Sequence, residues 1–511
     1  MHIGGNILKK TFSLIILIFI LFFVGCTDKN SNLKDTSINS TSKPNDIIST
    51  SMDSQKRAVA YFTSWSAYER NVTLNDVDPN LLTHINFAFA NLKSDGEIYI
   101  GDSWVDIEKL FSTNSETGIN GHFGELIKIK QKYPNIKTLI SVGGWTWSSN
   151  FSEVASTDAS REKFAKSAVE FITKYGFDGI DIDWEFPVEG GNNIPHKPED
   201  KTNYTKLLSK TREELYIQGR KDNKHYLLTI AGGPNVSFVE NTELSKIINY
   251  VDFINIMAYD YHGSWDSITN HNTPLYDDKN NSSVSNTVNA YISAGVNPKD
   301  LNLGLAFYGR GWSNVTNSAN NGLGQSGTAP TSKGYGQGTW EASSFDYWDL
   351  EENYINKNGY IRYFDNNAKV PYLYNGNTFI SYDDEESIKA KLSFSNEKNL
   401  GGVMFWEFSG DKNKVLQKVI KDFYDSSLSS NNITNKDIEE NPETNTISDN
   451  QLNGNTSSTK NEEIPSWNKD IVYTKDDIVL YDNKIFKAKW WTQNEIPNEA
   501  EEWGPWEIVK Q

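Results

Sequence analysis

Three carboxylic acids lie at two-residue spacing in residues 178–185, which read D-G-I-D-I-D-W-E. Side chains two positions apart in a β-strand face the same side, so Asp181, Asp183 and Glu185 are predicted to share one surface. Like charges this close resist ionising together, and at least one acid should keep its proton near neutral pH. A protonated carboxylic acid beside ionised ones is typical of sites that cleave glycosidic bonds.

The residues around the acids indicate how the segment is buried. Isoleucine and tryptophan alternate with the acids, and Tyr175-Gly176-Phe177 come just before them. Strands buried on both faces carry such apolar runs, which favours a buried strand over an edge strand with a solvated acidic face.

Eight segments of the central chain are predicted to be strands, and several are nearly continuous apolar runs. They are Ala58–Thr63, His84–Ala90, Thr138–Val142, Gly179–Glu185, Tyr226–Ala231, Phe253–Tyr259, Leu301–Phe307 and Gly402–Phe408. Helical periodicity lies between most of them, for example in Ser160–Tyr175 and Tyr204–Gln218. Strands alternating with helices over about 370 residues predict a (β/α)8 TIM barrel; the alternative is a doubly wound open sheet.

The interval between the seventh and eighth predicted strands is too long for a helix alone. Residues 312–379 are rich in Gly, Tyr and Asn, with short alternating patches such as Tyr360–Phe364. We predict a small α+β insertion there. Barrel sites form at the carboxyl ends of the strands, so the insertion would stand beside that mouth and form one wall of a substrate groove.

The ends of other strands bring further functional groups to the same mouth. The third strand ends at Trp145 after two glycines, the sixth at Tyr259-Asp260 and the seventh at Arg310, and the eighth contains Trp406. Aromatic, acidic, phenolic and guanidinium groups would then surround one cavity, which suits a carbohydrate.

The composition excludes several other classes of function. A net charge of −18 argues against nucleic acid and against an anionic membrane surface as partners. One cysteine cannot build a disulfide framework, and the seven histidines lack metal-binding spacing, so no metal and no cofactor are expected. Residues 322–327 match G-x-G-x-x-G, but they neither follow a clear strand nor open a helix, so dinucleotide binding is not predicted.

The N-terminus is predicted to be a targeting segment. Lys9-Lys10 precede the apolar run Thr11–Val24, whose 14 residues are short for a spanning helix of about 20. The run ends in F-V-G-C, which resembles a bacterial lipobox and implies lipidation of Cys26. A lipoprotein-type signal peptide over residues 1–25 is expected, with an ordinary secretory signal or an uncleaved anchor as alternatives. Each of them leaves the mature chain outside the cytoplasm.

Two polar segments divide the rest of the chain. Residues 26–56 and 426–463 are rich in Ser, Thr and Asn and cannot bury enough apolar surface to fold alone. We predict a disordered tether and a disordered linker, which delimit a catalytic barrel over residues 57–425 and a small module over residues 464–511.

The central part resembles glycoside hydrolase family 18, the chitinases, through motifs that agree in order and spacing. The matching pieces are Tyr61–Trp65, Asn86–Ala90, Ser141–Trp145, Asp178–Glu185, Met257–Asp260, Tyr308–Arg310, Tyr382–Asp384 and Gly402–Glu407. The resemblance implies hydrolysis of the β-1,4 linkages of chitin with retained configuration. The acetamido group of the substrate acts as nucleophile in place of a second carboxylate.

The resemblance also implies a role for each matching residue. Glu185 would be the general acid and base, Asp183 would orient the acetamido group, Asp181 would hold Asp183, and Tyr259 would donate to the acetamido oxygen. The predicted substrate-binding residues are Trp406, under the sugar whose linkage is cleaved, and Tyr61, Phe89, Trp145, Met257, Asp260 and Arg310.

The C-terminal module carries five of the chain's 15 tryptophans. Patches at Ile478–Tyr481 and Lys484–Ala488 predict short strands and a small all-β unit. Its motifs, such as Phe486–Thr492 and W-G-P-W at residues 503–506, resemble a family 5/12 carbohydrate-binding module and imply chitin binding. Adjacent Trp490 and Trp491 cannot both face inward on a strand, so one of them is expected to be free to stack on a sugar.

Three functions are compatible with these motifs. The leading one is a chitinase acting on chitin and N-acetylglucosamine oligomers, lipid-anchored on the outer face of the cell membrane or secreted. A chitin-binding lectin on the same barrel is disfavoured because such proteins usually lose the acid that Glu185 supplies. An enzyme acting on N-glycans or on a cell-wall glycan is disfavoured by the insertion and the C-terminal module.

Overall fold

The structure, a computed structural model, describes residues 56–111, 118–277 and 282–436, the last with side chains as far as residue 427. In the C-terminal module it describes residues 465–469, 472–473, 477–482, 484–489, 492–493, 495–498 and 505–509. The predicted signal peptide, Cys26, the tether before residue 56, Trp490 and Trp491 lie outside the described residues, as does the predicted linker from residue 437 to 463. Residues 426–436, the start of the linker that we predicted to be disordered, belong to a helix instead.

Eight parallel strands form a closed barrel, which confirms the predicted fold class. In the sheet the strands follow the order β1-β14-β8-β7-β6-β5-β4-β2, and the pairing of β1 with β2 closes the ring and excludes the open sheet. The strands are β1 (Arg57–Thr63), β2 (His84–Leu92), β4 (Lys137–Gly143), β5 (Gly179–Asp183), β6 (Leu227–Gly232), β7 (Phe253–Ile256), β8 (Leu301–Ala306) and β14 (Gly402–Trp406). The short strand β3 (Ile98–Ile100) extends the sheet beside β2.

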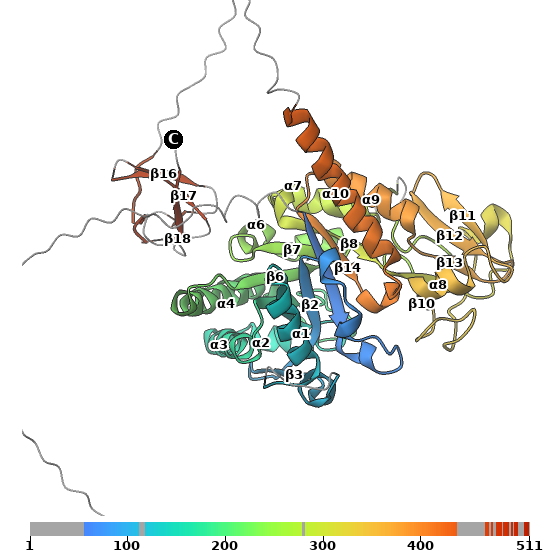
Figure 1. Cartoon of the computed structure of the whole chain (residues 1–511), viewed down its shortest axis with the longest axis horizontal. Coiled ribbons are helices and arrows are strands. Elements are labelled where there is room, and N and C mark those ends of the chain that lie inside the picture. The colour runs from blue at the N-terminus through green and yellow to red at the C-terminus, as the bar shows by residue number, and fades with distance from the viewer. Residues whose placement is uncertain are drawn as a thin grey trace, which may run out of the picture. The chain divides into compact units, whose positions relative to one another are not determined.

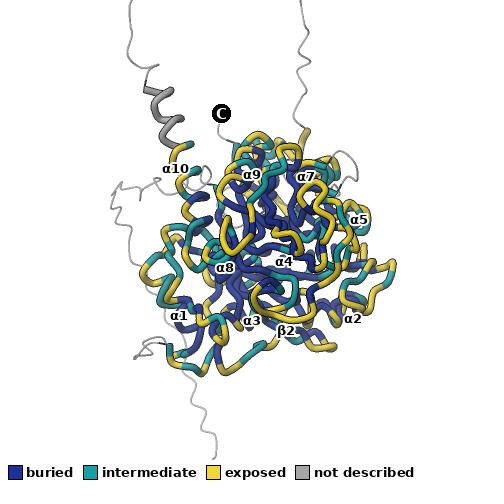
Figure 2. The backbone as a smooth tube through the Cα atoms, turned by 90° about the vertical axis from the view of Figure 1, so that its right-hand side faces the viewer, coloured by how far each residue is buried: buried dark blue, intermediate teal, exposed yellow. Residues whose placement is uncertain are grey.

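Helices surround the barrel and cover its outer face (Figure 1). They are α1 (Gly121–Lys132), α2 (Phe151–Val154), α3 (Asp158–Tyr175), α4 (Asp200–Asp222), α5 (Val236–Glu240), α6 (Leu244–Ile247), α7 (Val284–Ser293), α9 (Glu385–Glu397) and α10 (Val415–Lys436). Helix α3 shows why such a segment starts and stops where it does: the Thr157 hydroxyl accepts from the Ser160 N–H, and Gly176 ends the helix at a φ of 75°. Figure 2 shows the buried residues in the interior and the exposed ones on the outer turns.

The predicted insertion between the seventh and eighth barrel strands is a five-stranded antiparallel sheet with one helix. Its order is β10-β9-β13-β12-β11, and it lies on the side of the barrel away from α3 and α4 (Figure 1). The elements are β9 (Tyr308–Trp312), β10 (Ser344–Asp346), α8 (Tyr347–Asn353), β11 (Ile361–Asp365), β12 (Val370–Tyr374) and β13 (Phe379–Ser381).

A fully buried ion pair joins the end of this insertion to α9. The Lys391 ammonium donates to both carboxylate oxygens of Asp383, at 2.5 and 2.6 Å, and neither side chain is exposed. The hydroxyls of Ser387 and Thr273 donate to the same carboxylate at 2.7 and 2.8 Å. Burial lowers the pKa of Lys391, and the charge of Asp383 opposes that shift.

The C-terminal module is all-β, as predicted. It contains the pair β15 (Val472–Tyr473) and β18 (Thr492–Gln493), and the sheet β16 (Ile478–Tyr481), β17 (Lys484–Ala488) and β19 (Trp506–Ile508). A small core of Tyr473, Val479, Phe486, Ala488 and Trp506 holds these strands together.

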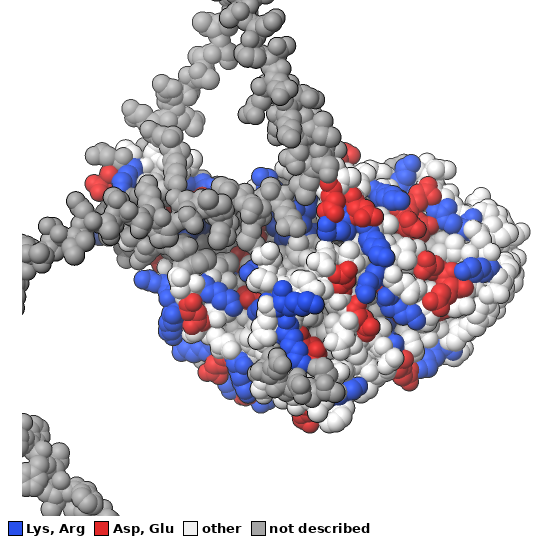
Figure 3. Space-filling view, in the orientation of Figure 1, with Lys and Arg blue, Asp and Glu red and all other residues white. Residues whose placement is uncertain are grey.

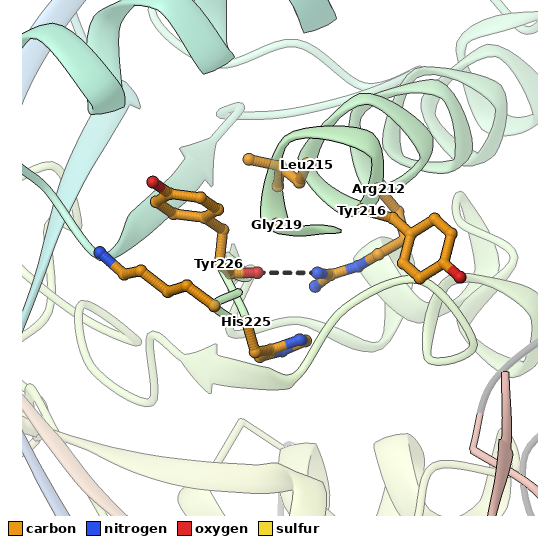
Figure 4. Close-up of a pocket in the computed structure, with 7 residues that line it drawn as sticks. Arg212, Leu215, Tyr216, Gly219, His225 and Tyr226 are labelled. Atoms are coloured by element: carbon orange, nitrogen blue, oxygen red, sulfur yellow. Dashed lines mark hydrogen bonds between the residues drawn. The ribbon is translucent and has the colours of Figure 1, made fainter. Parts of the chain in front are cut away.

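At the amino-terminal end of the barrel, Arg212 connects α4 to the segments before β6 and β7. Figure 4 shows Arg212 of α4 pointing at the backbone before β6, where it donates to the Tyr226 carbonyl at 2.8 Å. The same guanidinium donates to the Tyr250 carbonyl and to Asp252. The adjoining cavity of about 10 Å³ has room for little more than one water molecule.

The surface charge is mixed on the face that Figure 3 shows, and no helix among the residues that the structure describes suggests a membrane span. On the face shown in Figure 3, acidic and basic side chains are interspersed, so the negative net charge is not gathered there into one patch. Across the described ranges, none of the helices combines the length and the apolarity that a membrane span requires.

Candidate active site

The acids of β5 lie at the carboxyl end of the barrel, two of them inside it. Asp181 and Asp183 belong to the strand and are buried, whereas Ile180 and Ile182 pack in the layer between strands and helices. Glu185 lies two residues past the last residue of β5, so the predicted strand end was two residues too late. Glu185 still lies near enough to Asp183 for its negative charge, like that of Asp181, to raise the pKa of Asp183.

Asp181 is held by hydroxyl groups from three other strands. It stands directly across from Ser141 of β4 and Thr229 of β6, and both hydroxyls donate to its carboxylate, at 2.8 and 2.5 Å. The Tyr61 hydroxyl of β1 donates to it at 2.7 Å. Burial raises the pKa of Asp181, and these hydrogen bonds oppose the shift by stabilising the carboxylate.

Asp183 has no such support on one of its oxygens. Its Oδ1 is buried and finds no hydrogen-bond partner among the described residues. Burial, then the charge of Glu185 and then that of Asp181 raise the pKa of Asp183 well above its usual value. An acid in this state holds a proton easily and has an oxygen left to bind a further polar group.

Glu185 is partly exposed at the mouth, yet protein surrounds its carboxyl group. Burial, followed by the negative charge of Asp260, raises the pKa of Glu185 to about 8. The side chain is therefore protonated at neutral pH and can give its proton to a bound molecule.

Two adjacent residues of the loop after β7, Tyr259 and Asp260, stand near these acids. Tyr259 is buried, its hydroxyl lies 3.9 Å from the Met404 sulfur, and burial raises its pKa well above the usual value. Asp260 has a φ of 58° and accepts two hydrogen bonds from Arg310, both at 2.8 Å. The Arg310 guanidinium also lies over the rings of Tyr308 and Trp265, 4.8 and 5.5 Å from their centres.

Aromatic rings line the mouth beside the acids. Trp406 is partly exposed, and its ring stacks on that of Phe89 with ring centres 5.8 Å apart. The centre of the Tyr61 ring lies 5.7 Å from that of Trp406, and the two rings are tilted. Met257 belongs to the same cluster and is 8% exposed. Trp145, on the loop after β4, is 51% exposed and offers a free ring face. Such rings match the apolar faces of sugars.

Comparisons with known proteins agree with this arrangement. The model of "Glycosyl hydrolases family 18" matches residues 57–411, and that of "Carbohydrate-binding module family 5/12" matches residues 466–507. The chain belongs to glycosyl hydrolase family 18.

Named relatives and solved structures give the same family. Over 409 residues the chain is 48% identical to chitinase A1 of Niallia circulans, covering 71% of this chain and 58% of that protein. It is 36% identical to endochitinase 1 of Metarhizium robertsii, covering 69% and 81% of the two chains. A chitinase structure from Bacillus thuringiensis matches with a TM-score of 0.67 at 35% identity, covering 86% of this chain and 76% of the other. The structure of a family 18 N-acetylglucosaminidase from Paenibacillus barengoltzii matches with a TM-score of 0.61 at 35% identity. The match covers 72% of this chain and 99% of the other.

Some side chains of this family 18 site were not singled out from the sequence. Thr229 is the polar residue in the strand sequence L-L-T-I-A, and that interruption of an apolar run could have marked it. Ser148 contacts the backbone on both sides of Trp184, but nothing in its sequence neighbourhood indicates this. Within the described ranges, no group of three His, Cys, Asp or Glu residues is arranged to hold a metal ion.

The charge of Asp260 makes a testable contribution to the pKa of Glu185. Asp260→Asn should shift the alkaline limb of the kcat/KM profile from about pH 8 to lower pH, because the carboxyl then loses its proton more readily. Burial remains the larger cause, so we expect a shift of roughly half to one pH unit. The measurement is the pH profile of oligomer hydrolysis. Asp266→Asn, a change in the same loop that spares Asp260, is the matched control. An unmoved limb in Asp260→Asn would refute this coupling.

Proposed function

We propose that this protein is a chitinase that hydrolyses β-1,4 linkages between N-acetylglucosamine residues and retains the anomeric configuration. The observation that carries the proposal is the buried Asp183, whose Oδ1 has no hydrogen-bond partner among the described residues, beside Glu185, whose pKa burial raises. The names of the similar proteins support chitin as the substrate. The chain spans 58% of the length of chitinase A1.

In the proposed reaction Glu185 gives its proton to the glycosidic oxygen as the bond to the anomeric carbon breaks. The carbonyl oxygen of the substrate's own acetamido group attacks that carbon and forms an oxazolinium ion. Asp183 turns toward Glu185 and accepts a hydrogen bond from the acetamido N–H. The Tyr259 hydroxyl donates a hydrogen bond to the acetamido oxygen. The Glu185 carboxylate then takes a proton from water, whose oxygen bonds to the anomeric carbon. The bond from that carbon to the acetamido oxygen breaks, which opens the oxazolinium ring.

Asp181 supports this reaction by keeping a proton available to Asp183. Burial raises the pKa of both side chains, so a single proton held between them costs less than two buried charges. Because two such groups titrate together, we assign the proton to the pair.

We propose that Trp406 forms the floor under the sugar whose linkage is cleaved. Its ring meets those of Phe89 and Tyr61 at the centre of the mouth. The further sugar contacts would come from Trp145, Met257 and the Asp260–Arg310 pair.

The deciding experiment is hydrolysis of chitin oligomers with the two product anomers resolved. We expect the β-anomer to form first, since the nucleophile belongs to the substrate and two inversions restore the configuration. Release of the α-anomer would refute the mechanism, and binding without cleavage would identify a lectin. Release of N-glycans from a glycoprotein, with chitin oligomers left intact, would identify the third candidate.

The C-terminal module would hold the enzyme on insoluble chitin through Trp490 and Trp491. The double variant Trp490→Ala/Trp491→Ala should leave the rate on soluble oligomers unchanged and lower the rate on insoluble chitin by about 3- to 10-fold. The two rates can be compared directly on one preparation. Equal loss on both substrates would show that the module acts on the catalytic domain instead. Lipidation at Cys26, or secretion, would place the protein outside the cell.

A further inference from the structure

The proton donor stands where the barrel sheet no longer supports the chain. The ladder between β4 and β5 ends with the pair Gly143 and Asp183, and Glu185 lies beyond it. A backbone N–H past the end of a ladder needs another partner, because a buried and unpaired donor is costly. The partner of the Glu185 N–H is the hydroxyl of Ser148, at 3.0 Å.

Ser148 binds the chain on both sides of Trp184. Its Oγ lies 3.0 Å from the Asp183 carbonyl and 2.8 Å from the Gly144 carbonyl, and it accepts from Glu185. The side chain is fully buried, so water cannot take over these contacts. One hydroxyl thus connects the loop after β4 to the residues before and after Trp184.

The surroundings fix Ser148 itself. The Gly144 N–H donates to the Asp183 carbonyl at 2.8 Å. A Cβ on Gly143 would lie 2.2 Å from that same carbonyl oxygen, so the two strand ends approach as closely as glycine permits. Three residues after Ser148, Phe151 stacks on the buried ring of Trp184 with centres 5.4 Å apart.

We infer that Ser148 is a positioning residue that sets the place of the Glu185 carboxyl group relative to Asp183. The inference rests on the proposed function, since it matters only if Glu185 donates the proton. A mutation far from the reacting bond can lower the rate about 10²-fold if it moves a catalytic group by about 1 Å. Ser148 bonds the backbone N–H of the donor residue itself. Its hydroxyl is buried and contacts backbone atoms of Gly144, Asp183 and Glu185, so its effect on the donor would pass through the backbone.

The test compares Ser148→Ala with Ser148→Thr, which keeps the hydroxyl, and with Ser152→Ala. Ser152 is a buried serine of the same segment whose hydroxyl bonds Asp200 at 2.8 Å, so its loss measures general loosening. We expect Ser148→Ala to lower kcat on chitin oligomers by about 10- to 100-fold with KM within about threefold. Ser148→Thr should recover most of this loss, and Ser152→Ala should stay near wild type.

A second readout separates positioning from damage to the fold. An aryl chitobioside with an acidic phenol needs little help from a proton donor, so the penalty of Ser148→Ala should be several-fold smaller on nitrophenyl chitobioside than on chitin oligomers. An equal penalty on both substrates, or wild-type kcat, would overturn the inference. If wild-type enzyme cleaves no chitin oligomer, the proposed function fails. If wild type is active, Glu185→Gln is inactive and Ser148→Ala is unimpaired, only this inference fails.

Discussion

Glu185→Gln is expected to lower kcat on chitin oligomers by about 10²- to 10⁴-fold, the range that general acid–base catalysis contributes. Glutamine keeps the size of the side chain and can still donate a hydrogen bond, but it cannot transfer a proton to the leaving oxygen. Burial and Asp260 keep the wild-type acid protonated to about pH 8, so the loss should appear across the neutral range. Steady-state rates of reducing-end release measure it.

The control for this variant is Glu189→Gln, the same chemical change at an exposed position four residues on. It should retain the wild-type rate. Binding of oligomers to Glu185→Gln should persist, because the aromatic rings of the mouth are untouched. A Glu185→Gln enzyme within tenfold of wild type would place the proton donor elsewhere.

Lys391→Ala should destabilise the catalytic domain by about 3–5 kcal/mol, because it leaves the charge of Asp383 buried and unpaired. Ser387 and Thr273 would still donate to the carboxylate, but two hydroxyls replace an ammonium poorly. Chemical denaturation gives the change in the free energy of unfolding. Lys389→Ala, on the same helix but exposed and 3.8 Å from Glu385, should cost less than about 0.5 kcal/mol.

Removing both charges tests the explanation. The double variant Lys391→Met/Asp383→Leu should recover most of the lost stability, since an apolar pair of similar size avoids the cost of burying ions. If the double variant were as unstable as Lys391→Ala, packing and not charge would be the cause. If Lys391→Ala lowered the free energy of unfolding by less than about 1 kcal/mol, solvent would reach the Asp383 carboxylate in the variant.

The barrel could be predicted from the sequence because its strands are apolar runs separated by helical periodicity. The end of β5 was harder to predict. Apolar and acidic residues alternate through Trp184 and Glu185, yet the strand stops at Asp183 because its neighbour β4 stops at Gly143. A strand ends where its partner ends, and a single segment does not contain that information.

The acids of the site were evident from spacing, but their supporting contacts were not. Tyr61, Thr229 and Asp181 come from strands more than forty residues apart in sequence and meet only because the barrel closes. The same holds for Asp260 and Arg310, which belong to different strand ends and share two hydrogen bonds. Such pairs follow from register, which the sequence alone leaves open.

The last barrel strand, β14, carries Trp406 and Met404, and it pairs with the first strand, β1. The ribosome makes β14 last of the eight, so every earlier length of nascent chain lacks both Trp406, the proposed floor of the site, and the strand whose pairing with β1 completes the ring. If the proposed function is correct, we expect no hydrolysis from a growing chain until synthesis has passed residue 406. The onset of hydrolysis during translation would then report when β14 pairs with β1 and completes the barrel.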